Sequence, residues 1–277
     1  MNRERFAPSP TGLLHPGHAF SALTAFEAAR DGSFVLRIED IDVPRSRPEY
    51  ETAIYEDLAW LGIDWPMPVL RQSRRIPDHE RALQKLINMG LCYPCSCTRK
   101  DIQAALSAPQ EGSDIGPDGV IYPGTCRGRP MSDRTHGDAV RLDMRKAVAA
   151  LKAPLRYTEI GESAGDYEVM SDTLVTWAGD VVMARKDIGT SYHLAVVVDD
   201  AAQHITHVTR GMDMMTATPI HVLLQKLLGY PTPLYRHHRL IRDDAGRRLA
   251  KRHDALTLRA LRHQGKTPAD IRAMVGL

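Results

Sequence analysis

The sequence has no apolar run long enough to span a membrane, and its N-terminus has no apolar segment of the kind found in signal peptides. Cysteine is scarce: the 277 residues include four, and three of them lie between positions 92 and 97. Cysteines crowded in this way suit metal binding better than a disulfide framework, and they fit a reducing compartment. We therefore expect a cytoplasmic protein with no membrane partner.

Net charge is also low, at a formal +2, but it is unevenly distributed. Residues 231–277 contain eleven Lys and Arg against four Asp and Glu, so this tail carries +7 and the remainder −5. A basic tail beside an acidic body is typical of a nucleic-acid face, although a solvated helical surface has the same composition. The length allows one large domain or two modest ones.

The stretch from residue 5 to residue 18 carries the most informative pattern, RFAPSPTGLLHPGH. It predicts a short extended segment, a loop broken by proline and glycine, and a helix that stops near Gly32. A helix that begins after such a loop directs free N–H groups and the positive end of its dipole at one point, which suits a phosphate. His15 and His18 would lie beside that point, and Gly17 would let a ligand approach the backbone. An ordinary loop before an amphipathic helix is the alternative.

The letters His-Pro-Gly-His resemble the His-x-Gly-His signature of class I aminoacyl-tRNA synthetases, whose histidines contact the phosphates of ATP. The preceding RFAPSPTG resembles the opening of glutamyl-tRNA synthetases. The resemblance implies an α/β protein with a Rossmann-like nucleotide-binding catalytic domain, which uses ATP with Mg²⁺. It assigns ATP binding to His15, Gly17 and His18.

A predicted strand at 33–39 delivers Glu39, Asp40 and Asp42 to a strand end, where open α/β sheets bind ligands. Three carboxylates so close repel one another unless a cation, an ammonium group or an arginine offsets them. A loop that caps the following helix, predicted at 48–61, is the alternative. The run RIEDID again resembles glutamyl-tRNA synthetases, and it implies that Glu39 binds the α-ammonium of an amino acid.

The cysteines form a second candidate site. Cys95, Cys97 and Cys126 can supply three thiolates of a tetrahedral zinc shell, and the residues leave the fourth ligand open among Cys92, Tyr122, His136 and water. Buried free cysteines are the alternative. A Cys-x-Cys followed by Tyr-x-x-x-Cys resembles the zinc site of glutamyl-Q tRNA(Asp) synthetases, short relatives of glutamyl-tRNA synthetases. The resemblance implies one structural Zn²⁺ held by Cys95, Cys97, Tyr122 and Cys126.

The α/β pattern is interrupted between about 91 and 165 and then resumes. The valine run at 196–198 fits either a strand or a buried helix, and a strand is predicted at 204–211. The runs YHLAVVVDD and ITHVTRG resemble the second half of the glutamyl-tRNA synthetase core. By this resemblance, the L-glutamate site consists of Arg5, Phe6, Ala7, Pro8, Ser9, Glu39, Tyr192 and Arg210, with the two arginines as forks for carboxylates.

The segment RRLAKR at 247–252 resembles a modified KMSKS loop in which Lys251 is retained. A cation there would offset charge on the leaving pyrophosphate, so we assign catalysis to His15, His18 and Lys251 and add Lys251 to the ATP site. Two positions depart from the enzymes that charge tRNA(Glu): Val196 stands where they usually have Asn, and Met214 near where they have Trp. Part of the pocket is therefore altered.

These features predict four segments: a first half of the catalytic core at 1–90, an inserted zinc-containing α+β subdomain at 91–165, a second half at 166–230, and a KMSKS-like loop with a basic helical tail at 231–277. No anticodon-binding domain is expected. This architecture resembles the glutamyl-Q tRNA(Asp) synthetases. It implies tRNA-independent formation of glutamyl-AMP from L-glutamate and ATP, then transfer of glutamate to queuosine in the anticodon stem-loop of tRNA(Asp), by a monomer. Two alternatives are a truncated glutamyl-tRNA synthetase that charges a tRNA 3′ end and an inactive zinc-containing RNA-binding protein.

Overall fold

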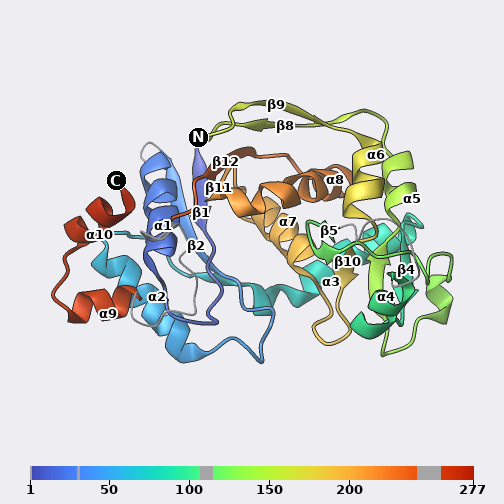
Figure 1. Ribbon diagram of the computed structural model, residues 1–277, viewed down its shortest axis with the longest axis horizontal. Coiled ribbons are helices and arrows are strands. Elements are labelled where there is room, and N and C mark those ends of the chain that lie inside the picture. The colour runs from blue at the N-terminus through green and yellow to red at the C-terminus, as the bar shows by residue number, and fades with distance from the viewer. Residues whose placement is uncertain (1, 30–31, 107–114, 242–256) are drawn as a thin grey trace.

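A computed structural model of the chain describes residues 2–29, 32–106, 115–241 and 257–277. Two groups of parallel strands meet at its centre (Figure 1). In the first group, β2 (Ser33–Ile38) pairs with both β1 (Arg3–Phe6) and β3 (Leu70–Arg71). In the second group the order is β11 (His207–Gly211), β12 (Leu234–His238), β8 (Leu155–Glu159) and the antiparallel β9 (Gly165–Val169).

The two groups join where β1 lies beside the start of β11. The backbone N–H of Thr206 donates to the carbonyl of Arg3 at 3.1 Å, and the N–H of Arg3 donates to Oγ1 of Thr206 at 2.8 Å. Arg3 lies beside Thr206 and Arg5 beside Thr209, so β1 and β11 run in the same direction and their carboxyl ends open toward the same edge. Such a switch point is where open α/β sheets bind ligands, and the arrangement confirms the predicted Rossmann-like core.

Helices cover both strand groups. Several begin with proline in the first turn, where the missing N–H costs no intrahelical bond, and α8 ends at Gly229 in the left-handed conformation. Among the described residues, no helix combines the length and apolar character that a membrane crossing requires. The helices and turns of this part are α1 (Pro16–Ala28), α2 (Pro48–Trp60), η1 (Gln72–Arg75), α3 (Ile76–Asn88), α7 (Tyr192–Ala202), η4 (Met212–Ala217), α8 (Thr218–Leu228), α9 (Leu258–His263) and α10 (Pro268–Val275).

A smaller antiparallel sheet forms the inserted subdomain, with β7 (Ala139–Leu142) between β4 (Cys92–Cys95) and β10 (Val182–Ala184). It lies at the far end of the molecule from α10 (Figure 1). Shorter elements surround this sheet: α4 (Arg99–Leu106), β5 (Ile115–Gly116), β6 (Gly119–Val120), η2 (Met131–Asp133), α5 (Met144–Ala149), α6 (Ser171–Thr173) and the π-helical turn η3 (Leu174–Ala178).

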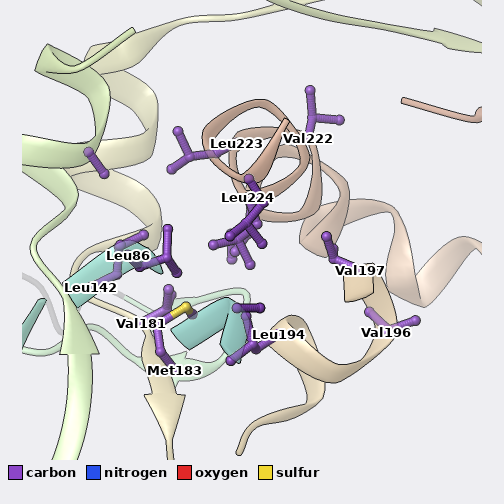
Figure 2. Close-up of a cluster of buried hydrophobic side chains, with 14 of the residues drawn as sticks. Leu86, Leu142, Val181, Met183, Leu194, Val196, Val197, Val222, Leu223 and Leu224 are labelled. Atoms are coloured by element: carbon purple, nitrogen blue, oxygen red, sulfur yellow. The ribbon is translucent and has the colours of Figure 1, made fainter. Parts of the chain in front are cut away.

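The largest apolar cluster joins the insertion to the second half of the core. In Figure 2, Leu194 and Val197 of α7 and Leu224 of α8 point toward Leu142 and Met183 of the small sheet. The valine run that fitted either a strand or a helix is therefore helical, and Val196 is buried in it. Because α7 packs against α3, α8 and β10, it is apolar on several sides, which explains why its sequence lacks a helical period.

The sheets interleave across the expected segment boundary at 165/166. β9 begins at Gly165 and pairs with β8 in the sheet of β12, whereas β10 pairs with β7 in the insertion. The chain thus leaves the insertion for β8 and β9, returns to it at β10, and only then enters α7. Strand pairing between distant segments decides this order, and local sequence patterns do not record it.

Candidate active site

The N-terminus of α1 is organised by the two histidines of the opening motif. His15 is the N-cap: its Nδ1 accepts from the N–H of Gly17 at 3.1 Å, while Nδ1 of His18 accepts from the N–H of His15 at 3.2 Å. The ring centroids lie 3.8 Å apart. This reciprocal arrangement is a capping box built from imidazoles. It places both rings at the positive end of the helix, as the phosphate hypothesis requires.

A cavity of about 140 Å³ opens at this helix end. His15, Gly17, His18 and Gly211, at the end of β11, are among the residues that line it. A Cβ on Gly17 would lie 2.9 Å from Cε1 of His15, and a Cβ on Gly211 would lie 2.5 Å from Oδ1 of Asp213, so a side chain at either position would displace its neighbour. Lys251, the third residue assigned to this site, lies outside the described residues.

Four charged side chains converge at the carboxyl ends of β1 and β2. Oδ1 of Asp200 accepts from Nε of Arg5 at 3.1 Å and from Nη1 of Arg37 at 2.6 Å, and Nη2 of Arg37 donates to Oε1 of Glu39 at 3.1 Å. Arg5 also donates from Nη1 to the carbonyl of Thr209 at 3.1 Å. The formal charges of the four side chains cancel, so this cluster is a neutral frame.

The ionisation of this frame follows from its pairing. Burial acts to raise the pKa of Asp200, but the charges and hydrogen bonds of Arg5 and Arg37 outweigh it and hold that pKa below its usual range. For Glu39 burial prevails: its pKa is raised, although Arg37 and Arg5 oppose the shift. Glu39 is thus the less satisfied carboxyl of the two, and a cationic ligand group beside it would be stabilised.

Arg210, at the end of β11, is buried in different surroundings. Its Nε donates to Nε2 of His237 at 3.0 Å, its Nη1 donates to Nδ1 of His221 at 3.1 Å, and its Nη2 donates to Oγ1 of Thr218 at 2.7 Å. Burial, followed by the charge of Arg210, lowers the pKa of His221 well below its ordinary value and that of His237 to about 4. Both histidines are therefore neutral at pH 7.

Tyr192 connects the two arginine environments. Burial raises the pKa of its hydroxyl, and the charges of Arg210, Glu39 and Arg5 all act on it. Arg210, Glu39 and Arg5 therefore all lie within electrostatic range of Tyr192, and these four residues mark the candidate amino-acid pocket. The loop from Phe6 to Ser9 begins at the end of β1. Phe6 is part of the buried core and Pro8 accepts from the N–H of Glu39 through its carbonyl at 3.0 Å, whereas no side-chain contact distinguishes Ala7 or Ser9.

The cysteine cluster lies in the insertion, remote from this pocket. The Sγ atoms of Cys95, Cys97 and Cys126 lie within 4.8 Å of one another, with 3.5 Å between those of Cys97 and Cys126. Oη of Tyr122 lies 3.4 Å from the Sγ atoms of both Cys95 and Cys97. In a tetrahedral zinc site with the usual bond lengths, ligand atoms are about 3.5 to 3.8 Å apart. The four residues thus fit a Zn²⁺ ion.

The structure also narrows the choice of a fourth zinc ligand. Cys92 belongs to the large apolar cluster, and burial raises its pKa to about 12, so it is an inert core thiol. His136 is exposed and lies outside the cluster of sulfur atoms. Burial acts to raise the pKa of Cys126, but hydrogen bonds from Tyr122 and from the Ser96 backbone lower it to about 6. In the same cluster, burial raises the pKa of Cys97 to about 11 and also raises that of Tyr122, so of these three side chains Cys126 ionises most readily.

Sequence reasoning missed several functional neighbours. Asp200, which binds Arg5 and Arg37, sits inside a helix pattern that reads as ordinary structure. Arg37, by contrast, is one of the two arginines, with Arg45, that the sequence offers to offset the carboxylates near Glu39. His221 and His237 gave no motif at all, because each acts only through Arg210. The one usable signal was the paired acids at the end of YHLAVVVDD, since two adjacent aspartates are unusual in an otherwise apolar helix.

Comparison with known proteins agrees with this geometry. The family described as "tRNA synthetases class I (E and Q), catalytic domain" matches residues 2–277. The chain belongs to this class I tRNA synthetase family. Within the family, it is 53% identical to the glutamyl-Q tRNA(Asp) synthetase of Rhodobacter capsulatus over 278 residues, which cover 99% of each chain.

Relatives named as glutamate–tRNA ligases are longer. The enzyme of Aquifex aeolicus is 37% identical over 270 residues, which cover 96% of this chain but 54% of that protein. The crystal structure of the glutamate–tRNA synthetase of Elizabethkingia anophelis superposes with a TM-score of 0.70 at 28% identity, covering 91% of this chain and 52% of that one. The shared part is the catalytic half of those enzymes, as the sequence motifs predicted.

Proposed function

We propose that the protein activates L-glutamate with ATP to glutamyl-AMP and then transfers the glutamate to the queuosine base in the anticodon of tRNA(Asp). The observation that carries the first step is that Arg5, Glu39 and Arg210 all lie within electrostatic range of the hydroxyl of Tyr192, a grouping that we propose as the glutamate pocket. The second step is supported by the 53% identity, over the full length of both chains, with a protein named glutamyl-Q tRNA(Asp) synthetase.

Charge complementarity favours glutamate in that pocket. The frame of Arg5, Arg37, Glu39 and Asp200 is neutral, so Arg210 leaves the pocket with one positive charge. Glutamate carries a net charge of −1 at pH 7, because it has two carboxylates and one ammonium group. In our proposal Glu39 receives the ammonium, Arg210 and Arg5 receive the carboxylates, and the hydroxyls of Tyr192 and Ser9 add hydrogen bonds.

The nucleotide would bind at the N-terminus of α1. The imidazoles of His15 and His18 would hold the phosphates through Nε2, because their backbone N–H groups already donate within the helix cap. The cavity beside Gly17 and Gly211 would admit the ribose–phosphate chain. The carboxylate of glutamate then attacks the α-phosphorus, the bond to the leaving pyrophosphate breaks, and Lys251 together with Mg²⁺ offsets the charge that develops. Positioning supplies most of the catalysis, since no covalent nucleophile is required.

The insertion would serve the transfer step. One structural Zn²⁺ bound by Cys95, Cys97, Tyr122 and Cys126 would fix the loops around β4, because their own apolar cluster is small. The surface between this subdomain and the catalytic pocket would hold the anticodon stem-loop by shape, phosphates and splayed bases. We further propose that the protein acts as a monomer in the cytoplasm, where tRNA, ATP and reduced thiols are found.

The function is tested by ATP–pyrophosphate exchange and by transfer of labelled glutamate. We expect glutamate-dependent exchange without tRNA, and label only on tRNA that carries queuosine. Label on queuosine-free tRNA would instead show charging of the 3′ end, and an absence of any exchange would show an inactive RNA-binding protein. Periodate treatment beforehand should abolish labelling, because it destroys the diol of queuosine.

The metal proposal has its own test. We expect about one zinc per chain by metal analysis of the purified protein, and its loss in Cys97→Ser. Cys92→Ser is the matched control, because Cys92 lies in the apolar core and should leave the zinc content unchanged. Equal zinc content in all three proteins would contradict the assignment.

A further inference from the structure

A chain of hydrogen bonds leads from Arg210 out of the pocket to the inserted subdomain. Nε2 of His221 lies 3.0 Å from Nδ1 of His193, and Nε2 of His193 lies 2.9 Å from both carboxylate oxygens of Asp118. Asp118 sits in the turn between β5 and β6. Both histidines are buried, whereas the side chain of Asp118 is 50% exposed.

The two ends of this chain fix the position of every proton in it. Arg210 can only donate, so Nδ1 of His221 accepts and the proton of that neutral ring is on Nε2. Nε2 of His221 then donates to Nδ1 of His193, which leaves the proton of His193 on Nε2. The carboxylate of Asp118 can only accept, so it receives that proton. Donor and acceptor roles therefore agree at all three joints.

Without the carboxylate, the opposite arrangement becomes available. If His193 carried its proton on Nδ1, it would donate to Nε2 of His221, and the proton of His221 would move to Nδ1. That N–H would face the N–H of Arg210, so two donors would oppose each other and the guanidinium would lose an acceptor. Asp118 thus selects the tautomer of His193 and His221 in which Arg210 keeps its bond.

The hairpin that carries Asp118 is held in place by close backbone packing. A Cβ on Gly116 would lie 2.3 Å from the carbonyl oxygen of Trp177 in η3, so only glycine permits this approach. Figure 1 shows β5 beside β10 and near α7, which carries His193. The hairpin thus brings a carboxylate from the insertion to a helix that belongs to the catalytic core.

On the opposite side, a shorter connection mirrors this one. His237 accepts from Arg210 at Nε2 and donates from Nδ1 to Oε2 of Glu159 at 2.5 Å. Glu159 is buried and also accepts from the N–H groups of His237 and Gly161. Arg210 is therefore fixed by Thr218 and by His237 from within the core, and its remaining partner, His221, is the one whose chain of hydrogen bonds ends at the hairpin.

We propose that Asp118, acting through His193 and His221, is a positioning residue for Arg210, so that the glutamate pocket is complete only when the β5–β6 hairpin is docked on α7. This inference rests on the proposed activation of glutamate. It assigns to the insertion a role in binding the amino acid, in addition to any contact with RNA. Asp118, His193 and His221 do not touch the substrate themselves.

The test is glutamate-dependent ATP–pyrophosphate exchange in the full chain, with KM measured for glutamate and for ATP. We expect Asp118→Ala to raise the KM for glutamate roughly five- to tenfold, with the KM for ATP and kcat within about twofold. Asp118→Asn should restore most of the affinity, because its amide oxygen still accepts from His193. Asp133→Ala is the control, since Asp133 is an exposed carboxylate of the same subdomain.

Two variants of His221 test whether Asp118 acts on Arg210 through this histidine. His221→Asn keeps an acceptor near the Nδ1 position for Arg210 but cannot reach His193, whereas His221→Gln keeps a group near Nε2 and leaves Arg210 without its acceptor. We expect His221→Gln to raise the KM for glutamate more than His221→Asn does. In the His221→Asn background, Asp118→Ala should have no further effect, because the connection is already broken.

The outcomes separate two kinds of failure. Three results would each overturn the positioning role of Asp118 while glutamate activation stands. They are an unchanged KM for glutamate in Asp118→Ala, an equal rise in the KM for ATP, and a full effect of Asp118→Ala in the His221→Asn background. If the unmodified protein showed no glutamate-dependent exchange, the proposed function itself would fail, and the positioning role with it.

Discussion

Two arginines lie at the carboxyl ends of neighbouring strands from the two halves of the core, and their surroundings are opposite. Arg5, at the end of β1, is bonded directly to the carboxylate of Asp200, which also receives Arg37. Arg210, at the end of β11, donates to His237, His221 and Thr218, and no carboxylate of the described residues lies within ion-pair distance of it.

The difference separates structural charge from binding charge. A guanidinium that shares a carboxylate has its field cancelled at short range, so it mainly fixes the geometry of its neighbours. A guanidinium held by neutral acceptors keeps its orientation and also keeps its charge for a ligand. In our proposal, Asp200 and Arg37 therefore fix the frame of the pocket, Arg5 belongs to that frame and makes the weaker contact with a carboxylate, and Arg210 is the principal anion receptor.

The largest effect is expected where the frame is broken. Asp200→Asn leaves two buried guanidinium groups without their shared charge, and we expect a loss of about 3 to 5 kcal/mol in the free energy of unfolding at pH 7. Because pairing lowers the pKa of Asp200 in the folded state, this stabilisation is complete above the unfolded pKa of about 4 and is lost as the pH falls further. Denaturant titrations at pH 7 and below pH 4 measure how the difference in unfolding free energy between Asp200→Asn and the unmodified protein becomes smaller at low pH.

A second prediction concerns Arg210, the proposed receptor for the substrate carboxylate. Arg210→Lys keeps the positive charge but loses the planar fork, so at least two of the three bonds to His237, His221 and Thr218 are lost. We expect kcat/KM for glutamate in pyrophosphate exchange to fall about 100-fold, or about 3 kcal/mol, with the KM for ATP little changed. Arg156→Lys, on the exposed β8–β9 ribbon, is the control. A loss shared equally by both substrates would contradict a receptor role.

A smaller effect is expected at the ammonium site. Glu39→Gln keeps an oxygen that can accept from Arg37 but removes the charge that faces the substrate. A hydrogen bond to a charged group contributes about 1.5 to 3 kcal/mol, so we expect a 10- to 100-fold rise in the KM for glutamate. The exposed Glu49→Gln serves as the control. An unchanged KM would show that the ammonium binds elsewhere.

The smallest effect is expected at Asp57, a buried carboxyl outside the pocket, where it again depends on whether a buried charge is compensated. Among the described residues, Asp57 in α2 has no hydrogen-bond partner and a guanidinium nitrogen of Arg262 lies 3.8 Å away, while burial raises its pKa to about 6. The folded state therefore holds the proton more tightly, and stability declines as the pH rises from about 4 to about 6.

Asp57→Asn removes the free-energy cost of burying the ionised carboxylate. We expect it to stabilise the protein by about 1 to 2 kcal/mol at pH 8 and to be neutral at pH 4, since the lost attraction to Arg262 offsets part of the gain. Thermal unfolding at the two pH values measures this, with the exposed Asp64→Asn as control. A destabilised variant at pH 8 would show that the ion pair with Arg262 outweighs burial.

Local patterns predicted most of the fold. The helix at 48–61, the strand at 33–39 and the strand–loop–helix opening all appear within a few residues of their predicted bounds, because proline, glycine and apolar spacing act within one or two turns. The pairing of β9 with β8 and of β10 with β7 was not predicted, since strand partners are chosen by packing between distant segments.

The residues of the candidate site divide in the same way, into features that the sequence shows and features that only folding decides. The sequence by itself determined which groups could serve as ligands: the imidazoles of His15 and His18, the carboxylate of Glu39, the arginines, and the closely spaced cysteines. Only the tertiary structure decided which of their charges are cancelled. Asp200 comes to Arg5 from 195 residues away and Asp118 comes to His193 from 75 residues away. Because electrostatic compensation depends on distance and burial, it is fixed only when these segments pack together.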